Sequence, residues 1–87
     1  MSINKLTEPN STDLFISSDL ALAAVVSLYF PIVIVDKENP RKAQFVFNRS
    51  KNLRELVDNY WNGKLLVEPR KYFDSIKALK ARLYDNI

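Results

Sequence analysis

The side chains of this sequence that could carry chemistry are mostly basic, and nearly all of them follow residue 35. Residues 1–35 hold one basic and three acidic side chains, whereas residues 36–87 hold twelve basic and seven acidic ones. Lysine and arginine side chains contact the phosphates of nucleic acids and supply much of the binding affinity. We therefore expect phosphate contacts from Lys37, Arg41, Lys42, Arg49, Lys51, Arg70 and Lys71. The alternative is that these charges only solubilise turns and helix faces, because acidic residues lie among them.

Residues suited to catalysis or metal binding are scarce. The chain has no cysteine and no histidine, so the common pairs of nucleophile and base are missing. Its single glycine excludes the glycine-rich loops that cradle phosphates. Asp36 and Glu38 have the spacing of a Mg²⁺ pair, but a charged turn has the same pattern. We predict a protein that is not an enzyme, with no catalytic residue, no metal and no cofactor.

Length and composition indicate one small domain. The chain has 87 residues, of which 47% are hydrophobic and 26% charged, as in ordinary globular proteins. We expect a flexible leader at residues 1–11 and a single α+β domain at residues 12–87. The longest uncharged run, residues 20–35, is shorter than the roughly 20 residues that cross a bilayer and contains Pro31. No membrane partner is expected, and the lack of cysteine favours a cytoplasmic protein.

The first half of the domain predicts a strand, a helix and a hairpin. An apolar run at residues 14–16 suits a strand, and Ser17 to Asp19 can cap a helix over residues 20–29. That helix is apolar on nearly every side, so it is either buried in the protein or covered by a partner. The apolar runs at residues 32–35 and 43–48 flank a polar turn, which predicts an antiparallel hairpin.

The second half predicts two helices around a short connection. An apolar stripe begins at Leu53 and ends at Trp61, and Asn52 with Glu55 can form a capping box for this helix. Gly63 suits the left-handed position after it, and Pro69 suits the start of a helix over residues 69–84. We assign structural roles to Gly63, Trp61 and Pro69. Residues 64–67 can add an edge strand.

The predicted order is β-α-β-β-α-(β)-α. It gives a three- or four-stranded sheet with a central antiparallel hairpin and helices packed mainly on one face. Two functions follow for such a binding module. The first is a nucleic-acid-associated accessory protein that contacts phosphates through the basic hairpin turn. The alternative is a homo-oligomeric or protein–protein interaction module, which the apolar first helix and a sheet face with Val33, Val35 and Val46 suggest.

Four segments together resemble a known family. They are FISSDLALAA (residues 15–24), FVF (residues 45–47), LVDNYWNG (residues 56–63) and VEPR (residues 67–70). The pattern resembles a family of small prokaryotic and phage-associated domains of unknown function and covers residues 13–84. The resemblance implies a stand-alone domain from a microbial or mobile-element genome. It brings no catalytic residue and no ligand.

Overall fold

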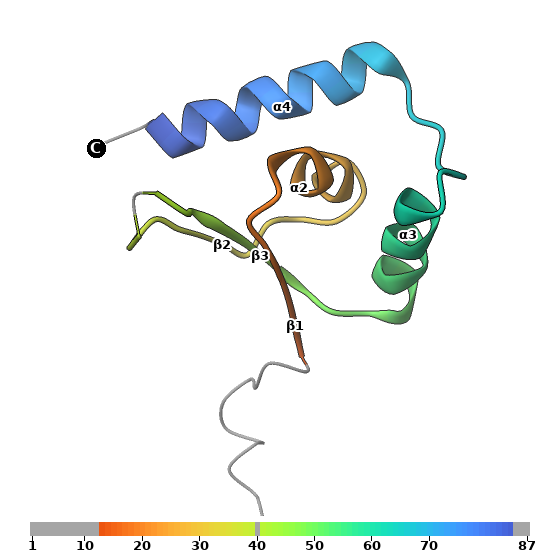
Figure 1. The fold of residues 1–87 in the computed structure, drawn as a ribbon, viewed down its shortest axis with the longest axis horizontal. Helices are drawn as coiled ribbons and strands as arrows, with labels where there is room; N and C mark the ends of the chain where they lie inside the picture. Colours follow the sequence, from red (N-terminus) through yellow and green to blue (C-terminus); the bar gives the residue numbers. More distant parts are fainter. Residues whose placement is uncertain (1–12, 40, 85–87) are drawn as a thin grey trace, which may run out of the picture.

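The computed structural model describes residues 13–39 and 41–84, so the predicted leader lies outside the described residues. Within these residues, three strands and three helices follow one another (Figure 1): β1 (Leu14–Ser17), α2 (Leu20–Ser27), β2 (Ile34–Asp36), β3 (Gln44–Asn48), α3 (Lys51–Trp61) and α4 (Pro69–Tyr84). This confirms the α+β class and the order of the elements. Of the two predicted sheets, the three-stranded one is observed, because residues 64–67 form an irregular connection and not the optional edge strand.

The sheet has the order β1-β3-β2, and both pairs of strands are antiparallel. Its central strand, β3, turns Phe45 and Phe47 toward the helices, where both side chains are buried. The ring of Phe15 lies opposite Phe47 on the neighbouring strand, with 6.2 Å between the ring centroids. These aromatic side chains are part of the hydrophobic core and leave no stacking platform on that face.

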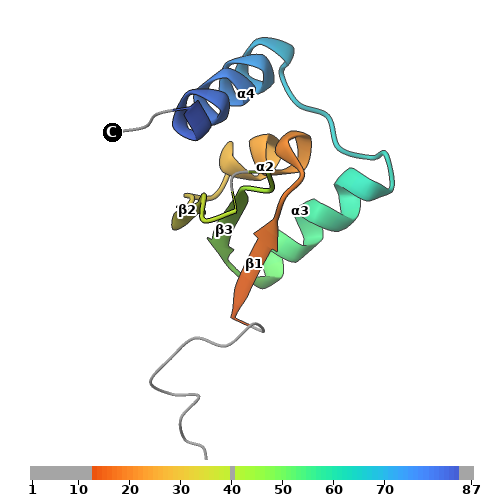
Figure 2. The same cartoon turned by 60° about the vertical axis from the view of Figure 1, so that its left-hand side comes forward.

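Helix α2 lies at the centre of the domain. Figures 1 and 2 show it between the sheet and α4, with α3 beside it, and it packs against α3, α4 and β1. Asp19 caps its first turn by accepting a hydrogen bond from the Leu22 N–H at 3.2 Å. Residues 22–26 are all buried, which accounts for a helix that is apolar on every side. Its apolar surface is therefore satisfied within the chain and needs no partner.

Helix α2 ends at Ser27, two residues earlier than the sequence pattern predicts. Its last turn tightens, because the N–H groups of Leu28 and Tyr29 donate to the carbonyls three residues before them at 3.1 and 3.0 Å. Pro31 follows directly, and the residue before a proline avoids the helical conformation. The chain then turns back to β2.

Helix α3 begins with a different cap from the one predicted. The hydroxyl of Ser50 accepts a hydrogen bond from the Leu53 N–H at 3.1 Å, and Asn52 lies inside the helix. The end of α3 agrees with the prediction: Gly63 has a φ of 71°. Its N–H donates to Tyr60 at 3.1 Å and that of Lys64 donates to Asn59 at 2.9 Å, the two bonds of a Schellman motif.

Helix α4 forms the outermost layer and packs on α2 (Figure 2). It begins at Pro69, as predicted, and the carboxylate of Glu68 accepts a hydrogen bond from the Lys71 N–H at 2.7 Å. Leu79 is its buried anchor. Among the described helices, none is long and apolar enough to cross a membrane.

Candidate functional site

The seven basic residues proposed from the sequence lie in three separate places. Lys37, Arg41 and Lys42 lie in the connection between β2 and β3. Arg49 and Lys51 follow the far end of β3, and Arg70 and Lys71 lie in the first turn of α4. The five residues of β3 span about 16 Å, which separates the first two groups, and α4 begins on the far side of the helical layer (Figure 1). The structure therefore does not bring the seven onto one surface.

Two of these basic side chains have roles within the fold. Lys37 donates from Nζ to the carbonyl of Arg82 at 3.0 Å and so caps the last turn of α4. Arg49 donates from Nη2 to the carbonyl of Leu14 at 3.1 Å, and its guanidinium lies 5.9 Å from the ring centroid of Phe15. Both contacts join segments far apart in the sequence, so these charges stabilise tertiary packing.

The turn between β2 and β3 also accounts for the acidic pair noted in the sequence. The carboxylate of Asp36 accepts a hydrogen bond from the Glu38 N–H at 3.0 Å, an arrangement typical of a tight turn. Arg41 and Lys42 are exposed beside it. Across residues 13–39 and 41–84, no group of three or more carboxylates is placed to hold a metal ion.

The open face of the sheet carries an apolar row. Ile16, Val46 and Ile34 lie opposite one another on β1, β3 and β2. Ile16 and Ile34 are 45% and 52% exposed, while Val46 between them is 6% exposed and lies outside the core cluster. The described helices α2, α3 and α4 all lie on the other side of the sheet (Figures 1 and 2). We call these three residues the open-face row.

The sequence placed Val33, Val35 and Val46 on this face, and the prediction was wrong for Val35, which pairs with Phe45 and packs against the core. Alternation holds within β2, but the register against β3 turns Ile34 and not Val35 to the open face. Val33 precedes β2, is exposed and donates its N–H to the carbonyl of Val46 at 2.7 Å. Val46 lies on the open face, as predicted.

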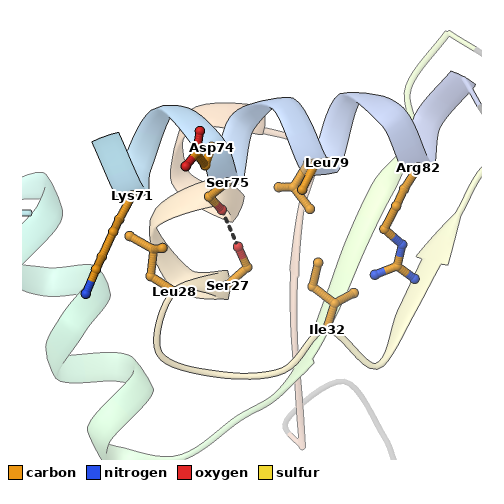
Figure 3. Close-up of a pocket in the computed structure, with 9 residues that line it drawn as sticks. Ser27, Leu28, Ile32, Lys71, Asp74, Ser75, Leu79 and Arg82 are labelled. Carbon is orange, nitrogen blue, oxygen red and sulfur yellow. Dashed lines mark hydrogen bonds between the residues drawn. The ribbon is translucent and has the colours of Figure 1, made fainter. Parts of the chain in front are cut away.

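A groove runs along α4, opposite the end of α2 and the connection to β2 (Figure 3). It has a volume of about 490 Å³ and is open to solvent along its length. Lys71 and Arg82 extend from α4 at its two ends, whereas Asp74 points the other way (Figure 3). Its lining residues are Ser27, Leu28, Ile32, Lys71, Asp74, Ser75, Ala78, Leu79 and Arg82.

Two serine hydroxyls join the walls of this groove. Ser27 Oγ and Ser75 Oγ lie 2.7 Å apart, and each is 2.9 Å from the carbonyl oxygen of Ala24. Two hydroxyls hold two protons, and the Ala24 carbonyl and the neighbouring hydroxyl oxygen are the acceptors within reach of both. The pair therefore has no proton left for a ligand and offers only acceptor lone pairs.

Sequence reasoning missed the contribution of Arg82 to this groove. The sequence spacing could have indicated that Arg82 lies on the same side of the helix as Lys71, because Lys71, Ser75, Ala78 and Arg82 fall at i, i+4, i+7 and i+11 on one helical stripe. The opposite wall comes from Leu28 and other residues more than forty positions earlier, which no local pattern connects with α4.

One described titratable group has a clearly shifted pKa and lies at the junction of α2, α3 and α4. Burial raises the pKa of the Tyr60 hydroxyl above 10.0, and the nearby Asp19 and Tyr72 raise it further. These effects stabilise the neutral phenol. Tyr60 is therefore a packing residue in the neutral range and not a base.

Comparisons with known proteins identify a family without an assigned activity. A search of curated proteins and a search of solved structures each found no match. A family model described as a domain of unknown function (DUF5659) matches residues 12–85, which is nearly the whole chain. This chain therefore belongs to that domain family.

Proposed function

We propose that this chain is a small non-enzymatic binding module that associates with a second copy of itself through the open-face row. The observation that carries the proposal is the pair of exposed side chains Ile16 and Ile34, which lie on either side of the nearly buried Val46 on the sheet face that the described helices leave open. The apolar first helix no longer supports self-association, because α2 is buried inside the domain. The absence of cysteine keeps the cytoplasm as the proposed location.

A second copy suits this face because the face is nearly complementary to itself. In a symmetric dimer the same patch meets itself across a two-fold axis. An axis through Val46 places Ile16 of one copy over Ile34 of the other, isoleucine on isoleucine. The one charged residue in β1, β2 or β3 is Asp36, whose carboxylate already accepts a hydrogen bond in its turn. No buried like-charge pair opposes the contact.

The area of the face sets the strength of the association. Three strands about 4.8 Å apart and three to five residues long give a face of about 200 Å². A stable interface buries about 800 Å² on each partner. The open-face row alone therefore supports a weak, transient dimer that forms near millimolar concentrations or when the chains are held together.

Sedimentation velocity of the full chain tests this proposal. We expect the sedimentation coefficient to rise as the protein concentration approaches about 1 mM, the range of a weak contact. Ile34→Lys places a charge on the half-exposed end of the row and should keep the protein monomeric. Leu66→Lys is the matched control, because Leu66 is 91% exposed on the connection between α3 and α4.

Two results would overturn self-association. One is a strict monomer at the highest concentration. The other is association that Ile34→Lys leaves unchanged while its circular dichroism spectrum remains native. An equal loss of association in Ile34→Lys and Leu66→Lys would show nonspecific association of exposed apolar side chains and would also refute a role for this face.

The second candidate is phosphate contact through the β2–β3 turn. It is favoured by Arg41 and Lys42, which are exposed there and form no ion pair with the rest of the described chain. Fluorescence anisotropy with labelled single-stranded DNA, duplex DNA and RNA at low and physiological salt tests it. Arg41→Glu with Lys42→Glu should abolish a salt-sensitive signal that the control Arg54→Glu with Lys64→Glu retains. Affinity that is unchanged by the first pair would refute the turn as a binding site.

A further inference from the structure

The groove along α4 has a basic side chain at each end and apolar residues between them. We infer that it binds an extended segment of a partner protein that carries two acidic side chains four residues apart with an apolar side chain between them on the same face. This site is separate from the open-face row, because the groove lies on the helical side of the sheet. The inference therefore does not rest on self-association.

The spacing of the two cations sets the length of the segment. Lys71 and Arg82 are eleven residues apart on α4, which places them on the same side of the helix and about 16 Å apart along its axis. Both are exposed, and Figure 3 shows them extending over the same opening. An extended chain advances about 3.3 Å per residue and turns every second side chain to the same face. Two acidic side chains four residues apart therefore lie about 13 Å apart on one face, within reach of both flexible basic side chains.

The floor between the cations suits apolar side chains. Leu28 and Ile32 are only half-buried, and Ala78, at the middle of the α4 stripe, leaves the space above them open. Leu79 closes the bottom as part of the core. An apolar residue of the partner would cover Leu28 and Ile32, which would remove apolar surface from water.

Other classes of ligand fit this groove less well. A nucleic-acid strand carries a phosphate at every nucleotide, whereas only two of the lining residues, Lys71 and Arg82, are basic. The serine pair, Ser27 and Ser75, has no proton to donate to a phosphate. A small molecule needs most of its surface buried, and this groove is open along its length.

The test uses the full chain and a labelled probe peptide. The probe has the sequence Glu-Thr-Leu-Thr-Glu, and two reference peptides carry glutamine at both ends or place the two glutamates side by side. We expect anisotropy to show saturable binding of the probe that is weakened by salt. The reference peptides should bind more weakly, because the first lacks both charges and the second cannot reach both cations.

Four variants connect this binding to the groove. Lys71→Gln and Arg82→Gln should each weaken it about two- to fivefold, the range of exposed ion pairs. Asp74→Asn should strengthen it by less than about twofold, because it removes the one acidic side chain that lines the groove, although its carboxylate points away from the opening. Ala78→Met should weaken it without any change of charge. Lys80→Gln is the control, because Lys80 lies nine residues from Lys71 and so on the opposite side of α4.

Three results would overturn the inference. The first is equal binding of the probe and the glutamine peptide. The second is an equal loss of affinity in Lys80→Gln and Arg82→Gln. The third is the lack of saturable peptide binding together with oligonucleotide binding that Lys71→Gln and Arg82→Gln abolish, which would assign the groove to nucleic acid. Native circular dichroism spectra for all variants would exclude loss of folding as the cause.

Discussion

The serine pair between α2 and α4 leads to a stability prediction that depends on hydrogen-bond counting. In a regular helix the Leu28 N–H would donate to the carbonyl of Ala24, but here it donates to Val25 at 3.1 Å. Ala24 is fully buried, so its carbonyl needs another donor. Ser27 and Ser75 supply it, each with its hydroxyl oxygen 2.9 Å from that carbonyl. Either hydroxyl alone is sufficient.

The double variant should therefore lose more unfolding free energy than the two single variants together. Ser27→Ala or Ser75→Ala removes one hydroxyl bond worth about 1 kcal/mol, and alanine restores up to about 0.5 kcal/mol of helix propensity. Each single variant should lose about 0–1 kcal/mol of unfolding free energy. The double variant leaves the carbonyl of Ala24 buried without a donor, which costs a further 1–3 kcal/mol or so. Its loss should exceed the sum of the single losses by at least about 1 kcal/mol.

Urea unfolding of the full chain, followed by circular dichroism at a helical wavelength, measures these differences. Ser18→Ala is a matched control, because Ser18 is exposed and precedes the cap of α2. It should change the unfolding free energy by less than about 0.5 kcal/mol. A loss of unfolding free energy in the double variant that equals the sum of the two single losses would refute this prediction. It would show that the two hydroxyls do not share the Ala24 carbonyl as one acceptor.

Three further predictions follow from caps and charges. Ser50→Ala should destabilise the protein by about 1 kcal/mol in urea unfolding, whereas Asn52→Ala should have little effect, because only Ser50 caps α3. Gly63→Ala should cost about 1–2 kcal/mol by the same measurement, although its methyl group would meet no atom, because φ is 71°. The folded protein holds the Tyr60 proton more tightly than the unfolded chain, so the unfolding free energy should be unaffected below pH 10 and fall as the pH rises through the raised pKa. Asp19→Asn keeps the cap and should lower that pKa in an ultraviolet titration that uses Tyr60→Phe to identify the signal.

Local sequence patterns correctly predicted the end of α3 and the start of α4, which depend on the conformation of single residues. Gly63 was placed correctly because a left-handed residue after a helix is a property of one position, and Pro69 because its ring suits a first helical turn. The cap of α3 was harder, because Ser50 and Asn52 both have the chemistry of a cap. The structure selects Ser50, because β3 ends at Asn48 and leaves only two residues before the helix.

Pairing between distant segments could not be predicted in this way. The open-face row depends on Ile16 lying opposite Val46, a register set by residues thirty positions apart. No local pattern selects this register, and alternation without it assigned Val35 in place of Ile34 to the open face. The dispersal of the basic residues has the same origin, since the position of α4 relative to β3 is a tertiary property.

The central position of α2 explains why one small domain can present two separate surfaces. A buried helix between the sheet and α4 satisfies the inner face of each, so the core does not require the open face of the sheet or the outer stripe of α4. Contact at Ile34 and contact at Arg82 would then use opposite sides of the core. A dimer formed through the open-face row would carry two grooves facing outward. A partner with two acidic segments could bind both, and the effective concentration of the second groove would strengthen a weak dimer that the area of the sheet alone cannot hold together.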